Sequence, residues 1–196
     1  MTKKRMSKRK RPASTVAIIV LLLIGTYIFN IFSSEEEQPS SRAGLIQVDL
    51  VKTIDGDTIK IKYEGKEQNL RYLLIDTPET NHPQLGKQPF GEKAKERNRE
   101  LVNSGKLEIE FDIGERIDKY GRLLAYVYVD GESIQEKLIE EGLARVAYVY
   151  PPNTRNLDLY EKAQERAKKA GIGIWTLEDY VTNRGFDSKT HEKESE

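Results

Sequence analysis

Acidic residues gather in two short segments of the sequence, DGD at residues 55–57 and DTPE at residues 76–79. Ionised groups are costly to hold beside a hydrophobic core unless a partner neutralises them. Calcium prefers roughly six to eight oxygen ligands, so Asp57, Asp76 and a main-chain oxygen would form an incomplete cage with room for substrate oxygens. The two segments therefore indicate either a salt-bridged turn or a cation site.

Three further side chains could carry out chemistry on a phosphate group. Arg71 lies five residues before Asp76, and Arg122 follows the segment DKYG. A guanidinium group presents a planar fork of donors to two phosphate oxygens and keeps its charge as negative charge builds up. Glu79, next to the rigid Pro78, could accept a proton from an attacking water. Taken singly, each arginine also fits a structural ion pair, and Glu79 also fits a surface loop.

Three tyrosines are further candidates for contact with a nucleotide: one lies in the segment DKYGR and two lie in the alternating segment VAYVY. Tyr120, Tyr148 and Tyr150 could stack on bases or donate hydrogen bonds to a terminal phosphate. They fit equally well as alternating barrel residues whose hydroxyl groups reach the rim. The lone tryptophan, Trp175, is expected in the core.

The composition restricts both the metal and the substrate. The 196-residue chain has no cysteine and two histidines, which disfavours thiolate and multi-histidine metal sites and favours oxygen ligands. Residues 1–44 carry 8 basic and 3 acidic side chains, whereas residues 45–196 carry 24 basic and 29 acidic ones. Because the globular part is mildly acidic, attraction of nucleic acid would depend on a local basic cluster. The candidates for that cluster are Arg71, Arg116, Lys119 and Arg122.

Alternating hydrophobicity predicts the elements that position these side chains. We expect strands at residues 45–52, 58–63, 67–75, 106–112 and 122–130, and helices at 90–103, 133–141 and 157–170. A helix between the third and fourth of five strands matches an OB-fold, a five-stranded β-barrel with about three helices (α+β). A five-stranded α+β sandwich is the alternative. In a meander the third strand ends beside the start of the second, so Asp57 and Asp76 should converge.

The N-terminal segment has the composition of a targeting signal. A basic flank, residues 1–15, precedes an apolar segment, residues 16–32, which is at the short end of a membrane span. The basic flank should stay in the cytoplasm, so the rest of the chain should lie outside a cell membrane crossed once or, after cleavage, be secreted. We predict a linker at residues 33–44, a folded domain at 45–182 and a polar tail at 183–196.

Four segments, TIDGDT, RYLLIDTPET, DKYGRLLAYVYVDG and GLARVAYVY, resemble the thermonuclease family, the calcium-dependent nucleases typified by staphylococcal nuclease. The resemblance runs from about Val48 to Trp175. It implies an OB-fold and a phosphodiester hydrolase that cleaves DNA and RNA and leaves 3′-phosphate ends. It also implies nucleic acid as the substrate and Ca²⁺ as the cofactor, and we expect a monomer that contacts the membrane through its N-terminal segment.

The resemblance assigns a role to each matching residue. Calcium would be held by Asp57, Asp76 and the carbonyl of Thr77; Arg71, Glu79 and Arg122 would be catalytic; and Lys119, Tyr120, Tyr148 and Tyr150 would bind substrate. One departure is the pair Gln84 and Leu85, which stands where the staphylococcal enzyme has two lysines. Two alternatives stay open: an OB-fold that binds nucleic acid without cleaving it, and a calcium-dependent surface interaction module.

Overall fold

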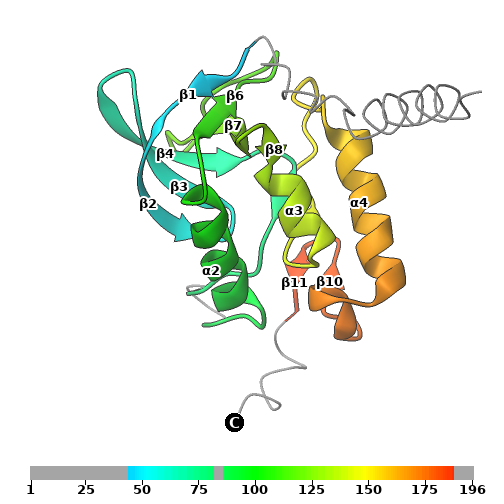
Figure 1. The fold of residues 1–196 in the computed structure, drawn as a ribbon. Coiled ribbons are helices and arrows are strands. Elements are labelled where there is room, and N and C mark those ends of the chain that lie inside the picture. Colours follow the sequence, from blue (N-terminus) through cyan, green and yellow to red (C-terminus); the bar gives the residue numbers. More distant parts are fainter. Residues whose placement is uncertain (1–43, 82–85, 188–196) are drawn as a thin grey trace, which may run out of the picture. The chain divides into compact units, whose positions relative to one another are not determined.

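The computed structural model describes residues 44–81 and 86–187, where a mixed β-sheet packs with three α-helices (Figure 1). The strands are β1 Ile46–Gln47, β2 Asp49–Asp55, β3 Thr58–Tyr63, β4 Lys66–Tyr72, β5 Ile75–Asp76, β6 Leu107–Glu110, β7 Leu123–Val129, β8 Glu132–Ser133, β9 Arg145–Val146, β10 Val181–Thr182 and β11 Gly185–Phe186. The helices are α2 Gly91–Val102, α3 Ile134–Glu140 and α4 Leu157–Ala170, followed by the 3₁₀-helix η1 Gly173–Thr176.

The two edges of the main sheet are consecutive in the sequence. The strand order is β1-β6-β7-β4-β3-β2, with β4 and β7 parallel, and Val48 alone separates β1 from β2. Val48 is buried, and its N–H donates to the carbonyl of Leu107 at 3.1 Å. The same segment therefore serves both edges and makes the sheet barrel-like without a closing strand pair among the described residues. The predicted OB-fold is confirmed.

Two of the predicted strands are divided in the structure. The expected strand 45–52 becomes β1 and β2, because after Val48 the chain leaves β6 and pairs with β3. The expected strand 67–75 ends at Tyr72, and β5 then pairs with β9 instead of the main sheet. The bend between β4 and β5 places Leu74 in the left-handed region, with φ of 66°. Alternating hydrophobicity did not reveal either change of partner.

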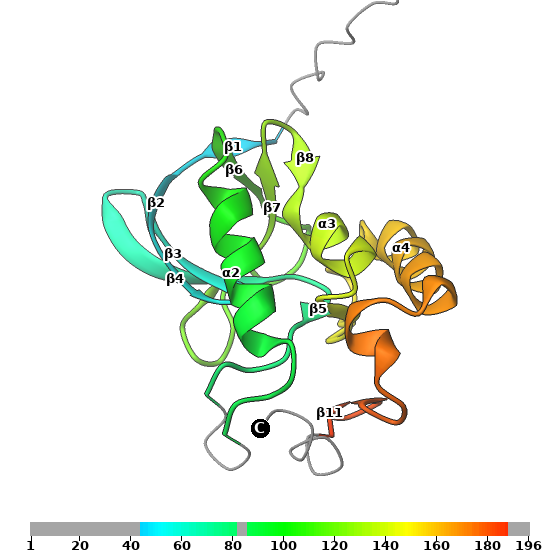
Figure 2. The same cartoon turned by 60° about the horizontal axis from the view of Figure 1, so that its bottom comes forward.

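The predicted helices are present, including one between the third and fourth long strands. The side chain of Ser133 caps α3 by accepting a hydrogen bond from the N–H of Glu136 at 3.3 Å. Gly142 follows α3 and Gly171 follows α4, both with positive φ, as expected for helix ends. Figure 2 shows α2 in front of the curled strands β2, β3 and β4, with α3 and α4 beside it.

A small second hydrophobic cluster lies at the C-terminal end of the described chain. It contains Ile174, Tyr180 and Phe186, and Trp175 packs against it half-buried instead of entering the main core. Strand β11 falls within residues 183–196, for which we expected a polar tail. Its single large apolar side chain, Phe186, accounts for the difference, because burial of one ring fixes an otherwise polar segment.

Among the residues that the structure describes, no helix is both long enough and apolar enough to cross a membrane. The predicted basic flank, apolar segment and most of the predicted linker lie outside the described residues, as do Gln84 and Leu85.

The carboxylate of Asp112 connects β6 to the segment that precedes α4. Asp112 accepts hydrogen bonds from Tyr126 Oη at 2.8 Å, from the N–H of Arg155 at 3.0 Å and from the N–H of Ile113 at 2.8 Å. Burial alone would raise the pKa of Asp112, but these hydrogen bonds outweigh it and hold the pKa below its usual range. The ionised carboxylate is therefore part of the folded structure.

We predict that Asp112 contributes stability that is lost in acid. Because its folded-state pKa is depressed, the contribution is complete above the pKa of an unfolded aspartate, about 3.9, and disappears as the pH falls through the folded-state value. As the pH falls below about 4, the free energy of unfolding should decrease more steeply in the wild type than in Asp112→Asn. Urea denaturation at several pH values measures this, and equal slopes would contradict it.

Candidate active site

The turn between β2 and β3 places Asp57 against the segment that follows β5. The Oδ2 atom of Asp57 accepts hydrogen bonds from the N–H of Thr77 at 3.0 Å and from Thr77 Oγ1 at 3.1 Å, and Oδ1 accepts one from Thr58 at 3.0 Å. Gly56 permits this approach, since a Cβ atom there would lie 2.6 Å from Thr77 Oγ1 and 2.9 Å from Ala94 Cβ. The predicted convergence of the two acidic segments is therefore present.

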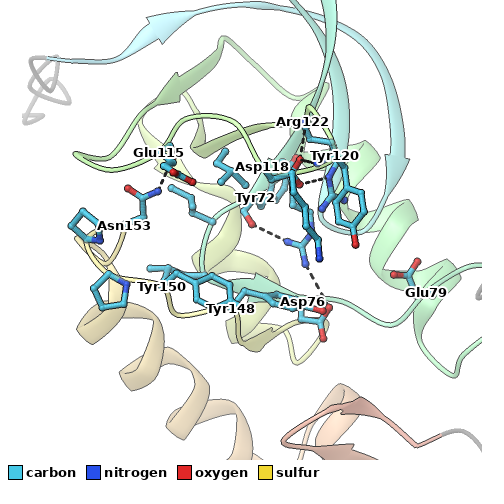
Figure 3. Close-up of a pocket in the computed structure, with 17 residues that line it drawn as sticks. Tyr72, Asp76, Glu79, Glu115, Asp118, Tyr120, Arg122, Tyr148, Tyr150 and Asn153 are labelled. Carbon is cyan, nitrogen blue, oxygen red and sulfur yellow. Dashed lines mark hydrogen bonds and ion pairs between the residues drawn. The ribbon is translucent and has the colours of Figure 1, made fainter.

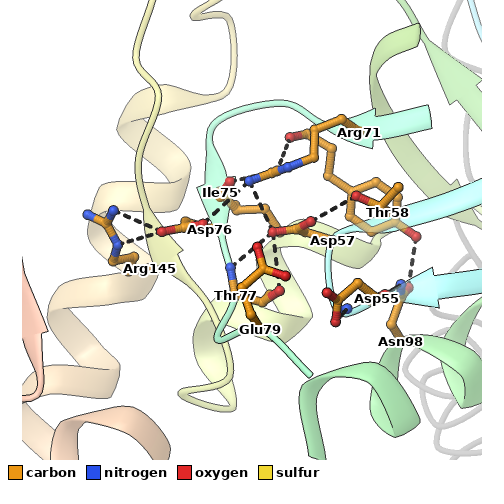
Figure 4. A network of polar contacts seen from close by, with 12 residues as sticks. Asp55, Asp57, Thr58, Arg71, Ile75, Asp76, Thr77, Glu79, Asn98 and Arg145 are labelled. Carbon is orange, nitrogen blue, oxygen red and sulfur yellow. Dashed lines mark hydrogen bonds and ion pairs between the residues drawn. The ribbon is translucent and has the colours of Figure 1, made fainter. Parts of the chain in front are cut away.

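Arg71 joins the two predicted metal-binding carboxylates (Figure 4). Its Nη2 atom lies 3.0 Å from Asp57 Oδ2 and 3.5 Å from Asp76 Oδ1. Its Nη1 atom donates to the carbonyls of Tyr72 and Ile75, both at 2.8 Å, which span the bend between β4 and β5. Arg71 is 9% exposed. Its guanidinium group is thus fixed by four contacts, and the bend is fixed with it.

Arg145 is a second basic partner that the sequence analysis missed. The register of β5 and β9 places Asp76 opposite Arg145, whose Nε and Nη2 atoms lie 3.0 and 2.8 Å from Asp76 Oδ2. The signal was present in the segment GLARVAYVY, where a basic residue occurs among buried apolar residues. A buried arginine requires a carboxylate or several carbonyl partners, although the sequence does not say which.

The carboxylates repel one another despite these arginines. Burial and then the charge of Asp57 raise the pKa of Asp76. Burial of its carboxyl group, a hydrogen bond with Asp55 and the nearby aspartates raise the pKa of Glu79 to about 8, although the residue as a whole is exposed. Burial is also the main cause that raises the pKa of Asp55. The cluster carries more negative charge than its arginines neutralise, so a cation would stabilise it.

No group of three or more acidic or histidine side chains among the described residues forms a complete metal cage. The predicted set is two carboxylates and one peptide carbonyl, all of them hard oxygen ligands. This donor set and the excess of negative charge fit an incompletely caged calcium ion.

A cavity of about 770 Å³ lies beside the carboxylate cluster (Figure 3). Eight of the predicted site residues line it: Arg71, Asp76, Glu79, Lys119, Tyr120, Arg122, Tyr148 and Tyr150. The other two, Asp57 and Thr77, lie behind this lining, where Asp57 contacts Arg71. The fold thus brings together side chains from β4, from β5 and the segment after it, from the segment before β7, and from the segment after β9.

Arg122 is oriented by Asp118, another residue that the sequence analysis did not single out. Arg122 Nε lies 2.7 Å from Asp118 Oδ2, while the N–H groups of Arg122 and Tyr120 both donate to Asp118 Oδ1 at 2.9 Å. Burial would raise the pKa of Asp118, but these hydrogen bonds outweigh it and lower the pKa. With Nε engaged by Asp118, both Nη groups of Arg122 remain to bind an anion in the cavity.

The three tyrosines predicted to bind substrate are exposed, which does not fit the alternative of alternating barrel residues with only their hydroxyl groups at the rim. Tyr120 is 72% exposed, Tyr150 is 70% exposed and Tyr148 is 53% exposed. Two of them lie against the candidate catalytic arginines, with Arg71 Cζ 5.3 Å from the centre of the Tyr148 ring and Arg122 Cζ 5.5 Å from that of Tyr120. One face of each of these two rings is therefore covered by an arginine, and the exposed remainder of each ring can contact a flat ligand.

A family model described as staphylococcal nuclease homologue matches residues 69–177. The chain belongs to the staphylococcal nuclease family. Its relatives in this family include Endonuclease YncB of Bacillus subtilis, 56% identical over 164 residues, which are 79% of this chain and 78% of that protein. The Thermonuclease of Staphylococcus hyicus is 36% identical over 163 residues, 81% of this chain and 95% of that protein.

A further staphylococcal nuclease relative is the SPbeta prophage-derived endonuclease YokF of Bacillus subtilis. It is 58% identical over 149 residues, and the match spans 76% of this chain and 50% of that longer protein. Membership of the staphylococcal nuclease family confirms the predicted family and, at the level of the family, the predicted nuclease-type hydrolase.

Proposed function

We propose that this protein is a calcium-dependent nuclease that hydrolyses phosphodiester bonds in DNA and RNA and leaves 3′-phosphate ends. The observation that carries the proposal is the cavity in which Arg71, Arg122 and Glu79 lie together beside the carboxylates of Asp57 and Asp76. When water attacks a phosphodiester, two guanidinium groups can stabilise the negative charge that develops, and a carboxylate can take the proton. The resemblance to thermonucleases supports the substrate and the position of the cut.

The two arginines would bind the phosphate in different ways. Arg71 uses its Nη groups on Asp57, Asp76 and two backbone carbonyls. With calcium bound by the two aspartates, the Nη2 group of Arg71 would be released and, together with Nε, could then bind the phosphate. Arg122 keeps its Nε atom on Asp118 and offers its Nη groups. Both stay charged as the attacked phosphate gains negative charge, which lowers the barrier.

Glu79 would take the proton from the attacking water. The water oxygen forms a new bond to phosphorus, the bond from phosphorus to the 5′ oxygen breaks, and the departing 5′ oxygen takes up a proton from solvent. The products are a 3′-phosphate and a 5′-hydroxyl. A general base must be ionised, and the positive charge of a calcium ion held by Asp57 and Asp76 would favour the ionised form of Glu79. Its position beside the cavity allows contact with a water on one side of the phosphate.

Asp57, Asp76 and the carbonyl of Thr77 would hold the calcium ion. When bound, the ion would supply positive charge to the phosphate and reduce the repulsion among the carboxylates. Lys119, Tyr120, Tyr148 and Tyr150 would bind the rest of the nucleotide through charge, stacking and hydroxyl groups.

For the N-terminal residues we propose export of the domain. The basic flank at 1–15 and the apolar segment at 16–32 support a membrane anchor, with the linker at 33–44 and the nuclease domain from 45 outside the cell. Protease added to intact cells should then degrade the protein, and the protein should fractionate with membranes. A soluble form in the medium that starts near Gly44 would instead indicate cleavage and secretion.

We predict that the purified protein releases acid-soluble nucleotides from DNA and RNA with calcium and not with a chelator. The new 5′ ends should accept phosphate from polynucleotide kinase without prior phosphatase treatment, because the cut leaves a 5′-hydroxyl. Retention of DNA without cleavage would favour an OB-fold that only binds nucleic acid. Calcium binding with neither retention nor cleavage would favour an interaction module.

We predict that calcium raises the melting temperature of the wild-type protein. A ligand that binds only the folded state stabilises it by about 2.7 kcal/mol at a hundredfold excess over its dissociation constant. Asp76→Asn should abolish both this shift and the activity, whereas Glu79→Gln should lose most activity and keep much of the shift. Melting curves with calcium or chelator measure the difference, and a wild-type curve indifferent to calcium would remove the metal from the proposed function.

A further inference from the structure

The hairpin of β10 and β11 lies beyond residue 177, where the match to the family model ends. Val181 pairs with Phe186 and Thr182 with Gly185, and the ring centres of Tyr180 and Phe186 are 5.4 Å apart. The hydroxyl of Tyr180 donates to the carbonyl of Pro89 at 2.6 Å. The hairpin is therefore attached to the segment that leads into α2, close to the candidate active site.

Phe186 contacts two residues that in turn hold the acidic segment. Its ring lies under the guanidinium group of Arg145, with the Cζ atom 5.6 Å from the ring centre, and Arg145 binds Asp76. Its carbonyl accepts a hydrogen bond from Gln88 Nε2 at 3.3 Å. Phe186 itself is 8% exposed, so these contacts are sheltered from water.

Gln88 binds both backbone groups of Glu79, the N–H and the carbonyl. Its side-chain Oε1 atom accepts a hydrogen bond from the N–H of Glu79 at 2.7 Å, and its backbone N–H donates to the carbonyl of Glu79 at 3.0 Å. Gln88 is 7% exposed. Because the carbonyl of Phe186 can only accept and the N–H of Glu79 can only donate, the two partners together fix the orientation of the Gln88 amide.

The start of α2 also packs closely against the backbone of Glu79. A Cβ atom on Gly91, the first residue of α2, would lie 2.5 Å from the carbonyl oxygen of Glu79. The backbone of Glu79 is thus enclosed by Gln88 and the start of α2, while its side chain stays exposed towards the cavity. A base must lie within hydrogen-bond reach of the water that it activates, so a fixed backbone has a direct use in catalysis.

We propose that Gln88 and Phe186 form a positioning pair that fixes Glu79 against the attacking water, so the C-terminal hairpin belongs to the catalytic apparatus. The proposal rests on the proposed function, in which Glu79 takes the proton. Neither residue lines the cavity. Both act through Glu79, and the hairpin adds a support outside the segment matched by the family model.

The first test is the kinetics of Gln88→Met, which removes both side-chain hydrogen bonds and keeps a similar length. On a short single-stranded oligonucleotide with calcium, kcat should fall by about tenfold to a hundredfold because the base is misplaced, while KM should change by less than about twofold. Phe186→Ala should give a smaller loss of the same kind. The matched control is Leu177→Ala, which loosens the same hydrophobic cluster and should keep the wild-type kcat.

A double-mutant cycle separates positioning from general destabilisation. If Gln88 acts through Glu79, adding Gln88→Met to Glu79→Gln should cause no further loss of kcat. If the second substitution lowers kcat by the same factor as it does in the wild type, Gln88 is a merely structural residue and the proposal is overturned.

Hydrogen exchange at the Glu79 amide tests the positioning without any activity. Exchange should be faster in Gln88→Met and in Phe186→Ala than in the wild type, and unchanged in Leu177→Ala. Equal protection in all four proteins would overturn the proposal even if the protein is a nuclease. Absence of cleavage by the wild type would overturn the proposed function and, with it, the catalytic use of the pair, whereas the exchange result would still show whether the pair fixes Glu79.

Discussion

The buried guanidinium group of Arg71 is the constraint on which the site depends. It lies between the carboxylates of Asp57 and Asp76 and also binds the carbonyls on either side of the bend between β4 and β5. Leaving one such buried charge without partners typically costs about 3–5 kcal/mol, so the arginine and the aspartates require one another. The bend after β4, the approach of Thr77 to Asp57 and the wall of the cavity all follow from satisfying this one side chain. The guanidinium group of Arg71 therefore both stabilises the fold around the site and takes part in the proposed chemistry.

The site is built as layers of alternating charge. Arg145 supports Asp76 from behind, Arg71 lies between Asp76 and Asp57, and Asp118 orients Arg122 across the cavity. Each arginine that faces the cavity is thus held by a carboxylate that does not need to move. Such preorganisation is effective because the fixed dipoles and charges need no rearrangement when charge develops on a substrate. It also explains how a mildly acidic domain can present a local anion site.

Much of this arrangement could be predicted from local patterns. Alternation and turn residues predicted a succession of strands and helices that matches an OB-fold. The meander predicted that Asp57 and Asp76 converge, and the pairing of Thr58 with Arg71 brings this about. The partner of Arg145 could not be predicted, because alternation indicates burial but not which carboxylate 69 residues away receives the charge. The hairpin was missed for a related reason. One phenylalanine hardly changes the polar composition of residues 183–196, so composition did not predict that its ring would contact Arg145 and its carbonyl would contact Gln88.

The sequence separation of these contacts affects the order in which the site can be completed. Asp76 finds its partner, Arg145, 69 residues further along the chain, and Gln88 finds its partner, Phe186, 98 residues further along. Neither contact can form before the later residue has been synthesised. A polypeptide that emerges with its N-terminus first carries the acidic segments long before their supports exist. Full alignment is therefore reached only when nearly the whole domain has left the ribosome.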